Sequence, residues 1–479
     1  MGAGVTDSAQ PTGKSASPEP TGAGHVDVPA AGCAAAGGSR REQRAWYFYD
    51  WANSAYVTTV LTVLVSPYLA TVAETAVCGQ AGSAAEPCTE QLSILGVPIS
   101  PGSLPLYVIT ASTLASAVLL PIVGAIADRS ARKKQLLGSL AWAGAAAAMG
   151  LVFVSGTNWQ LGVALLFAGN VCLAASQVIY DAILVEIAAP DERDRVSSRG
   201  WALGYLGGGL LLLLNLGLVQ FHDLWGLSTE AAVRISLFSA GLWWAVFTLI
   251  PYAGIRNRKP ASVVTGRGNV GQLLSTLREA RAYPMTLLFL AAYLCFNDGV
   301  QTVIYASSIF VNRQLEMPES TLILMVLIVQ FVAFGGALLF GRIAIRYGSK
   351  HTIMASLWIW IAIVGVAYFL PARQLAPVLL LGVAIGLVLG GTQALSRSLY
   401  SQFVPSGREA EYFGLYQIME RGTSWFGTLV FGIVHQVTDS YRPAILALMV
   451  FFALGFVLLW KVDPRRAVAD AGNPQPRVL

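Results

Sequence analysis

Charged residues are scarce in this chain, and their scarcity excludes most soluble folds. Asp, Glu, Lys and Arg together make up 12% of its 479 residues, against about 25% in a soluble domain. Hydrophobic residues make up 55%, in continuous runs of about 20 residues or longer, enough for a helix to cross a bilayer. A transmembrane β-barrel would show alternating segments of about ten residues instead. The composition therefore predicts an all-α, polytopic membrane protein.

The side chains that carry enzyme chemistry are also few. The chain has only four histidines, and they show no metal-ligand spacing. No nucleophile and base stand at a recognisable spacing, and no Walker motif marks a nucleotide site. We therefore expect no catalytic residue, no metal, no cofactor and no nucleic-acid partner, and both an enzyme and an ATP-driven pump are disfavoured.

Cysteine is rare as well, with five residues in the chain. Cys172 and Cys295 fall in apolar runs, where a cysteine is usually buried as a small apolar group. Cys78 and Cys88 flank a polar loop that the topology below places outside the cytoplasm. A disulfide persists there only in an oxidising compartment, so the sequence leaves the oxidised and reduced forms open.

The chain shows no secretory signal before its first apolar run. Residues 1–44 are rich in Gly, Ala, Pro and Ser and lack the hydrophobic core of a signal peptide. Such a composition buries too little apolar surface to fold. We therefore predict a disordered cytoplasmic tail over this segment.

Twelve apolar segments can cross a bilayer as helices, in two sets of six. The predicted spans are 46–73, 104–126, 135–155, 159–188, 199–220, 231–252, 285–311, 321–343, 351–371, 375–403, 411–436 and 441–461. The predicted domains are the tail 1–44, a bundle 45–252 with a long extracytoplasmic loop 74–103, a cytoplasmic linker 253–284, a second bundle 285–462 and a cytoplasmic tail 463–479.

Basic residues orient these helices, because cytoplasmic loops of membrane proteins carry an excess of Lys and Arg. Arg129, Arg132, Lys133 and Lys134 lie between spans two and three, and further clusters lie at every second connection. The loop 74–103 on the opposite side holds no Lys or Arg. Both termini are therefore expected in the cytoplasm.

An internal repeat links the two sets of helices. The stretch Gly124–Arg129 has a counterpart that begins 217 residues later (124 to 341), at Gly341. Two parallel repeats of six helices are typical of secondary transporters, which bind their substrate between the repeats near the bilayer midplane. Three further pairs match along the chain, with a longer offset in the first span: Gln177 with Gln393, Asp181 with Arg397, and Asn53 with Asn297.

Three stretches carry a resemblance to a known family. Residues 124–134 resemble the loop signature between spans two and three of the major facilitator superfamily, although Ala131 stands where that signature has glycine. The stretches 49–56 (YDWANSAY) and 195–209 (RVSSRGWALGYLGGG) resemble the vacuole-effluxer branch, named for yeast autophagy-related vacuolar amino acid exporters. The resemblance covers about residues 44 to 462 and implies the major facilitator fold, rocker-switch transport and amino acid efflux.

Two pairs of charged residues are candidates for gates. The resemblance implies that Asp128 and Arg129 latch the cytoplasmic face across the two halves; the simpler interpretation is that they only set the topology. Asp181 and Arg397 occupy equivalent positions about two turns inside the cytoplasmic ends. A charge that faces lipid costs about 2.5–3.5 kcal/mol on insertion scales. Both should therefore point inward, where they can pair with each other.

The pairing of Arg397 has alternatives in the sequence. Glu186, Glu420 or a backbone carbonyl could meet its guanidinium instead of Asp181. Arg421, two to three turns into span eleven, could hold the carboxylate of a solute through two parallel hydrogen bonds. The simpler alternative is a local ion pair with Glu420 or a neighbouring acid.

Polar residues of spans one and seven are candidates for binding a solute or a proton. Hydropathy puts Asp50 at the head of span one, but matching Asn53 with Asn297 moves Asp50 inside the membrane and predicts a helix that begins near Arg41. Asp298, near the middle of span seven, could exchange a proton, or it could stay permanently paired. The candidates are Tyr49, Asp50, Asn53, Gln177, Tyr180, Asn297, Asp298, Gln301, Gln393 and Arg421.

These features together predict a secondary active transporter for a small polar solute, an amino acid or a related metabolite, driven by a proton gradient or by the gradient of the solute. Arg421 would hold the carboxylate and Asp50 or Asp298 the ammonium group. A drug or sugar transporter of the same superfamily is the alternative, followed by a transporter-like receptor that binds without carrying. We expect a monomer in the lipid bilayer of a bacterial plasma (inner) membrane.

Overall fold

The computed structural model describes residues 38–80, 88–94, 96–260, 278–421 and 424–479, which belong to one compact unit. Most of the predicted tail 1–44, including Cys33, lies outside the described residues, as do parts of the loop 74–103 and of the linker 253–284.

The first half contains six long helical segments. One is continuous through α1 (Arg40–Ala55), a wider π-helical stretch η1 (Tyr56–Leu64) and α2 (Val65–Cys78). The others are α3 (Leu104–Arg129), α4 (Lys133–Gly150), α5 (Trp159–Ile187), α6 (Arg193–Gln220) and α7 (Thr229–Gly254). Short 3₁₀ turns join or extend them: η2 (Pro101–Ser103), η3 (Leu151–Phe153), η4 (Pro190–Glu192) and η5 (His222–Trp225).

The beginning of α1 corrects the predicted tail. The Ser39 hydroxyl accepts a hydrogen bond from the Glu42 N–H group at 3.3 Å, which caps the helix at its first turn. Residues 40–44, which composition assigned to a disordered tail, are therefore helical. The start at Arg40 agrees with the start near Arg41 that the repeat predicts.

The loop before α3 contains a small hairpin that the all-α prediction missed. Strand β1 (Leu92–Ile94) pairs antiparallel with β2 (Val97–Ile99), and Leu92 lies opposite Ile99. Strands of three residues are too short for a periodic signal in the sequence.

The second half follows the same plan. Its elements are α9 (Pro284–Ile309), η6 (Phe310–Gln314), α10 (Glu319–Tyr347), α11 (Ser349–Tyr368), α12 (Leu375–Gln402), α13 (Glu409–Arg421), α14 (Ser424–Thr438), α15 (Tyr441–Ala447), α16 (Met449–Lys461) and α17 (Pro464–Asp470). Within the described residues, 11 helices are long and apolar enough to cross a membrane. The predicted span 411–436 corresponds to α13 and α14, which flank two residues, 422–423, that are not described.

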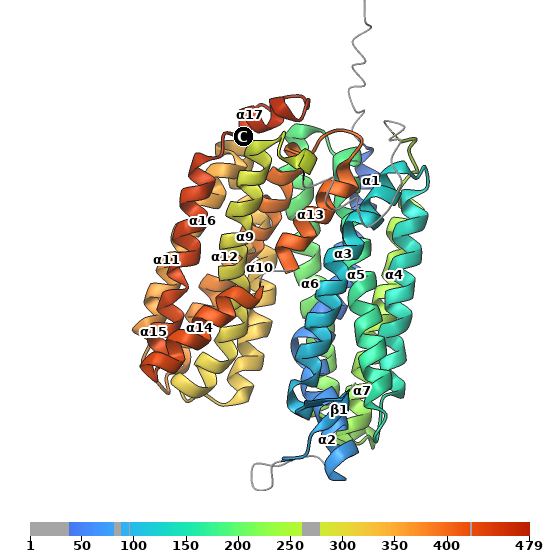
Figure 1. The fold of residues 1–479 in the computed structure, drawn as a ribbon, viewed down its shortest axis with the longest axis vertical. Coiled ribbons are helices and arrows are strands. Elements are labelled where there is room, and N and C mark those ends of the chain that lie inside the picture. Colours follow the sequence, from blue (N-terminus) through green and yellow to red (C-terminus); the bar gives the residue numbers. More distant parts are fainter. Residues whose placement is uncertain (1–37, 81–87, 95, 261–277, 422–423) are drawn as a thin grey trace, which may run out of the picture. The chain divides into compact units, whose positions relative to one another are not determined.

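Glycines allow the helices to approach each other closely. Three glycines of α6 at 200, 204 and 208 lie against α1, and three of α12 at 382, 386 and 390 lie against α10. The halves meet where α6 packs against α10 and α12, and where α13 packs against α3 and α5 (Figure 1). Many of the contacts below lie where α3, α5 and α12 end and where α6, α13 and α17 begin. We call this the α17 end.

Candidate functional site

A buried arginine of the second half is held by two aspartates of the first. Arg397 on α12 approaches Asp50 on α1 at 3.0 Å and Asp181 on α5 at 3.3 Å. Their exposed fractions are 2%, 5% and 1%. The Asp181–Arg397 pair expected from the repeat is therefore formed, but Arg397 lies nearer to Asp50. Of the alternative partners, a backbone carbonyl is also present, because Arg397 Nη2 donates to the oxygen of Ser197 at 3.1 Å.

Aromatic rings surround this arginine. Its guanidinium carbon lies 4.9 Å from the ring centroid of Trp46 and 5.3 Å from those of Tyr180 and Trp201. Tyr180 also donates its hydroxyl to Asp50 Oδ2 at 2.8 Å. Such rings attract a cation through their electron-rich faces. The site therefore holds the planar guanidinium of Arg397 by contacts with aromatic ring faces, by ion pairs and by hydrogen bonds.

The α6 glycine seam makes room for this ion cluster. A Cβ atom at Gly200 would lie 2.6 Å from Asp50 Oδ2 and 3.1 Å from Arg397 Nη2. Because α6 has no side chain there, α1 and α12 can bring their charges together across it.

The repeat-matched amides form equivalent bonds in the two halves. Gln177 Nε2 on α5 donates to Asn53 Oδ1 on α1 at 3.2 Å. Gln393 Nε2 on α12 donates to Asn297 Oδ1 on α9 at 2.9 Å. Tyr49, on the same stretch as Asn53, donates to the Ser176 hydroxyl at 2.5 Å. The YDWANSAY stretch thus binds α5, as its counterpart in α9 binds α12.

Asp128 joins the halves at the α17 end. Its carboxylate accepts the backbone N–H groups of Ala410 and Glu411, each at 2.9 Å, in the first turn of α13. The first N–H groups of a helix lack partners within it, and an acid is favourable there. Lys133 binds the same carboxylate at 3.3 Å and Glu186 at 2.7 Å. The acid thus caps a helix of the other half.

Arg129, the second residue of the expected latch, is placed differently. Its Nε and Nη2 atoms are buried and have no hydrogen-bond partner among the described residues. A latch role for Arg129 stays a prediction. The cation that does approach the start of α13 is Arg408, which pairs with Glu411 at 2.9 Å and Glu279 at 2.5 Å. Burial lowers the pKa of Arg408, but the hydrogen bond and charge of Glu411, with Glu279, outweigh it and raise the pKa above its usual value.

Two residues of α6 that the sequence analysis did not select also bridge the halves. Asp194 accepts hydrogen bonds from the hydroxyls of Ser349, at 2.7 Å, and Ser398. Arg193 Nη1 donates to the backbone oxygen of Ser401 at 2.7 Å. The signal for Asp194 was available, because it stands at the start of the helix that matches α13. Its partners are two serines rather than a cation, so a search for opposite charges misses it.

Arg421 lies at the end of α13, beside a network of polar groups. Its Nε donates to Gln417 Oε1 at 3.1 Å, and the other end of the Gln417 side chain donates to Asp181 at 2.9 Å and Glu420 at 3.1 Å. No acid lies within ion-pair distance of Arg421 in the described part of the chain. The local pair with Glu420, one of the two interpretations of the sequence, is therefore not formed among these residues.

Asp298 lies apart from this cluster. Its Oδ2 accepts the N–H group of Gly427 on α14 at 2.8 Å, and its Oδ1 is buried without a partner among the described residues. Gln301, one turn further along α9, is half-buried, and no hydrogen bond joins it to the described residues. The structure therefore does not bring Asp298 and Gln301 to Arg397.

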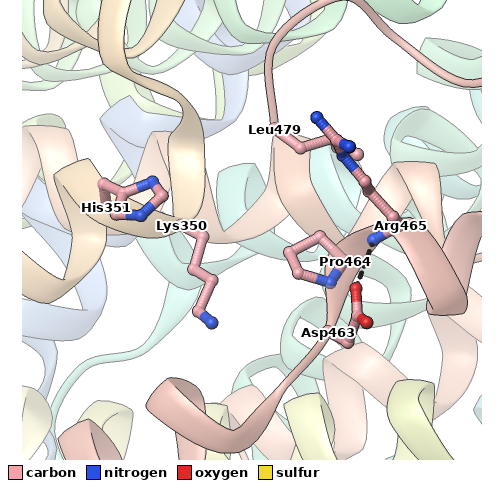
Figure 2. Close-up of a pocket in the computed structure, with 6 residues that line it drawn as sticks. All are labelled: Lys350, His351, Asp463, Pro464, Arg465 and Leu479. Atoms are coloured by element: carbon pink, nitrogen blue, oxygen red, sulfur yellow. Dashed lines mark hydrogen bonds between the residues drawn. The ribbon is translucent and has the colours of Figure 1, made fainter.

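Two further features lie away from the ion cluster. Cys78 and Cys88 form a disulfide with their Cα atoms 6.0 Å apart. A cavity of about 230 Å³ lies between the start of α11 and α17 (Figure 2). It contains none of the predicted site residues, and its lining is Lys350, His351, Asp463, Pro464, Arg465 and Leu479.

Comparison with known proteins covers nearly the whole described chain. A family model described as vacuole effluxer Atg22-like matches residues 38–472. An uncharacterized MFS-type transporter of Bacillus subtilis, YxiO, is 30% identical, over 91% of this chain and 97% of the relative. Autophagy-related protein 22-1 of Penicillium rubens is 26% identical, over 90% of this chain and 92% of the relative.

Solved structures of transporters share the fold. The human organic anion transporter MFSD10 has a TM-score of 0.65 at 14% identity, covering 88% of this chain and 99% of that one. The E. coli fucose:proton symporter FucP has a TM-score of 0.64 at 13% identity, covering 88% and 98%. Both likenesses concern the fold alone, which is that of the major facilitator superfamily.

Proposed function

Because this chain belongs to the vacuole effluxer Atg22-like family and is a transporter of the major facilitator superfamily, we propose that it is a secondary active transporter that exports a small polar solute, an amino acid or a related metabolite. The solute would bind between the two halves, which rock against each other to expose it to one side and then the other. By the distribution of basic residues, the α17 end faces the cytoplasm of a bacterial cell.

The observation that carries this proposal is the set of contacts across the α17 end. Arg397 joins two acids of the other half, Asp128 caps α13, and Asp194 meets Ser349. These groups belong to different halves, so they separate when the halves rock. Their closure corresponds to a state in which the cytoplasmic side is shut and the solute site opens outward.

The choice of an amino acid is supported by Arg421. Two of its guanidinium nitrogens make no hydrogen bond with the described residues, and the side chain is half-exposed. A guanidinium with a free edge can bind a carboxylate through two parallel hydrogen bonds. Glu420, the adjacent acid, could receive the ammonium group in place of Asp50, which is occupied by Arg397 and Tyr180.

Transport assays in proteoliposomes test this proposal. A thermal-shift panel of amino acids, sugars and organic cations would first select ligands, and flux of the hits would then be measured. We expect Arg421→Gln to raise the KM for an amino acid about ten- to hundredfold, because it removes a charge-assisted hydrogen bond worth about 1.5–3 kcal/mol. The matching amine without a carboxylate should be affected little.

The controls separate the candidate substrates. Arg313→Gln removes an exposed arginine that the sequence places on the far side, and should leave KM unchanged. Selection of a sugar or a carboxylate-free cation by the panel, with flux insensitive to Arg421→Gln, would contradict the amino acid assignment. Binding without any flux would favour the receptor.

A further inference from the structure

The ion cluster at the α17 end contains more acid than base. We define the gate cluster as Asp50, Asp181, Arg397, Glu420 and Arg421, joined by Gln417. Three carboxylates and two guanidiniums leave a formal charge of minus one. Burying an uncompensated charge costs several kcal/mol. The three buried members, Asp50, Asp181 and Arg397, already carry this minus one, because the half-buried Glu420 and Arg421 cancel each other. A closed gate with all five groups ionised is therefore unfavourable.

As far as the chain is described, the surrounding elements supply no further cation. On α6, Arg193 binds the Ser401 carbonyl oxygen instead, and Asp194 is held by the hydroxyls of two serines. The other titratable groups close to the cluster are phenols, which are neutral: Tyr180 on α5, Tyr205 on α6, Tyr293 on α9 and Tyr416 on α13. Among the described residues, the surplus negative charge is thus left to be neutralised by a proton.

We propose that the gate cluster binds one proton when the α17 end closes and releases it when this end opens, which makes it the coupling site of the transporter. The proton resides on the Asp181–Glu420 side, where Gln417 bridges the two carboxyls. Asp50 has the shorter contact with Arg397 and also accepts the Tyr180 hydroxyl. This assignment rests on the proposed transport function.

The cluster is suited to coupling because it lies between the moving halves. Asp50 and Asp181 belong to the first half, whereas Arg397, Glu420 and Arg421 belong to the second. Opening the gate separates these groups and admits water, so each can ionise alone. Asp298 is also buried, but its partner Gly427 belongs to the same half. Its surroundings therefore persist through a rigid-body movement, and a proton there would not be exchanged.

The sign of the pH effect follows from this difference. The closed form binds one proton more than the open form, so low pH favours closure and rising pH favours opening. A difference of one proton changes the ratio of the two forms by at most about tenfold per pH unit.

Distance measurements between spin labels test the proposal without any substrate. Labels at the exposed positions of Arg132→Cys and Tyr347→Cys would report the separation of the halves in lipid nanodiscs, with Cys33, Cys172 and Cys295 changed to serine. We expect the open population to rise with pH, by up to about tenfold per unit. Asp181→Asn and, independently, Glu420→Gln should abolish this dependence, because either change makes the cluster neutral.

Two further variants locate the proton. Asp298→Asn, the matched buried acid outside the cluster, should keep the pH dependence. Arg421→Gln should move the opening midpoint to lower pH, because the cluster then carries a charge of minus two and the closed form needs a second proton to become neutral. A pH-independent wild type, an unchanged slope in both Asp181→Asn and Glu420→Gln, or loss of the slope in Asp298→Asn would overturn the proposal. Absence of flux in proteoliposomes despite a pH-dependent gate would reject the transport function alone.

Discussion

At the scale of single residues, two glycines define how closely the halves can meet. A Cβ atom at Gly124 on α3 would lie 2.4 Å from the backbone oxygen of Ala410, and one at Gly341 on α10 would lie 2.6 Å from Ser198 Cβ. The two glycines occupy matching positions in the sequence repeat. Each therefore permits a contact with the opposite half that any other residue would obstruct.

Replacing these glycines should hold the α17 end open. We expect Gly124→Val and Gly341→Val each to shift the population towards the open form by at least tenfold, because the added side chain must displace the Ala410 backbone or the Ser198 side chain, at a cost of more than about 1.4 kcal/mol. The same spin-label distances measure it. Gly335→Val on α10 is the control, since no atom of another described element lies within 4 Å of a Cβ there. An equal shift in the control would show that steric obstruction at the boundary between the halves does not cause the opening.

At the scale of elements, the C-terminal tail crosses the boundary between the halves. After α17, Asn473 Nδ2 donates to the backbone oxygens of Gln402 and Val404 at 2.9 and 2.8 Å, in the second half. The Arg477 N–H group donates to Asp191 Oδ1 at 2.7 Å, in the first. The predicted cytoplasmic tail is thus a folded strap over the contacts of α6 and α12.

Loss of this strap should weaken closure. Asn473→Ala removes two hydrogen bonds to carbonyl groups, each worth about 0.5–1.5 kcal/mol, and is expected to raise the open population about five- to hundredfold. Gln475→Ala is the matched control, because within the described part of the chain its side chain bonds to Arg465 alone, in the tail itself. Spin-label distances at one pH compare the two variants. Identical distance distributions would mean that the strap does not stabilise the closed form.

Contacts between helices were predictable from the sequence where the repeat matches both partners. The repeat located the Asn53–Gln177 and Asn297–Gln393 bonds and the Asp181–Arg397 pair, because residues matched by symmetry meet in matched ways. It could not locate the contact of Asp50 with Arg397. Asp50 matches Leu294 in the second half, so this ion pair has no symmetric copy.

The strap and the hairpin were missed for different reasons. The strap binds backbone oxygens, which nearly every residue type offers, so the sequence does not reveal its partners. Its residues are also too polar to suggest burial. The hairpin is too short to give an alternating pattern. Composition nevertheless predicted the helical membrane fold, because the length and apolarity of each span depend on local sequence alone.

At the scale of the whole molecule, alternating access requires the α17 end to open in every cycle. Cysteines at the hydrogen-bonded pair Asp194 and Ser349, introduced as Asp194→Cys and Ser349→Cys, should crosslink only while this end is closed, since this contact joins the two halves. Oxidation should then reduce flux to background, and a reductant should restore it. Because a reductant could also open Cys78–Cys88, wild-type flux under the same treatment is the control.

One result of the crosslinking experiment would contradict alternating access at this end. Full crosslinking with undiminished flux would mean that solute passes without separation of α6 from α11. Each single variant, treated in the same way, should retain flux.

The repeat-matched glycines have a consequence for the response to salt. Ion pairs on a surface weaken as ionic strength rises, because mobile ions screen charges over about 10 Å at 0.1 M. The Arg477–Asp191 pair is of this kind, since its side chains are 91% and 48% exposed. Contact at Gly124 and Gly341 is a steric stop between uncharged atoms, which mobile ions do not alter. Salt should therefore change how often the α17 end closes, while the distance at which it stops stays the same.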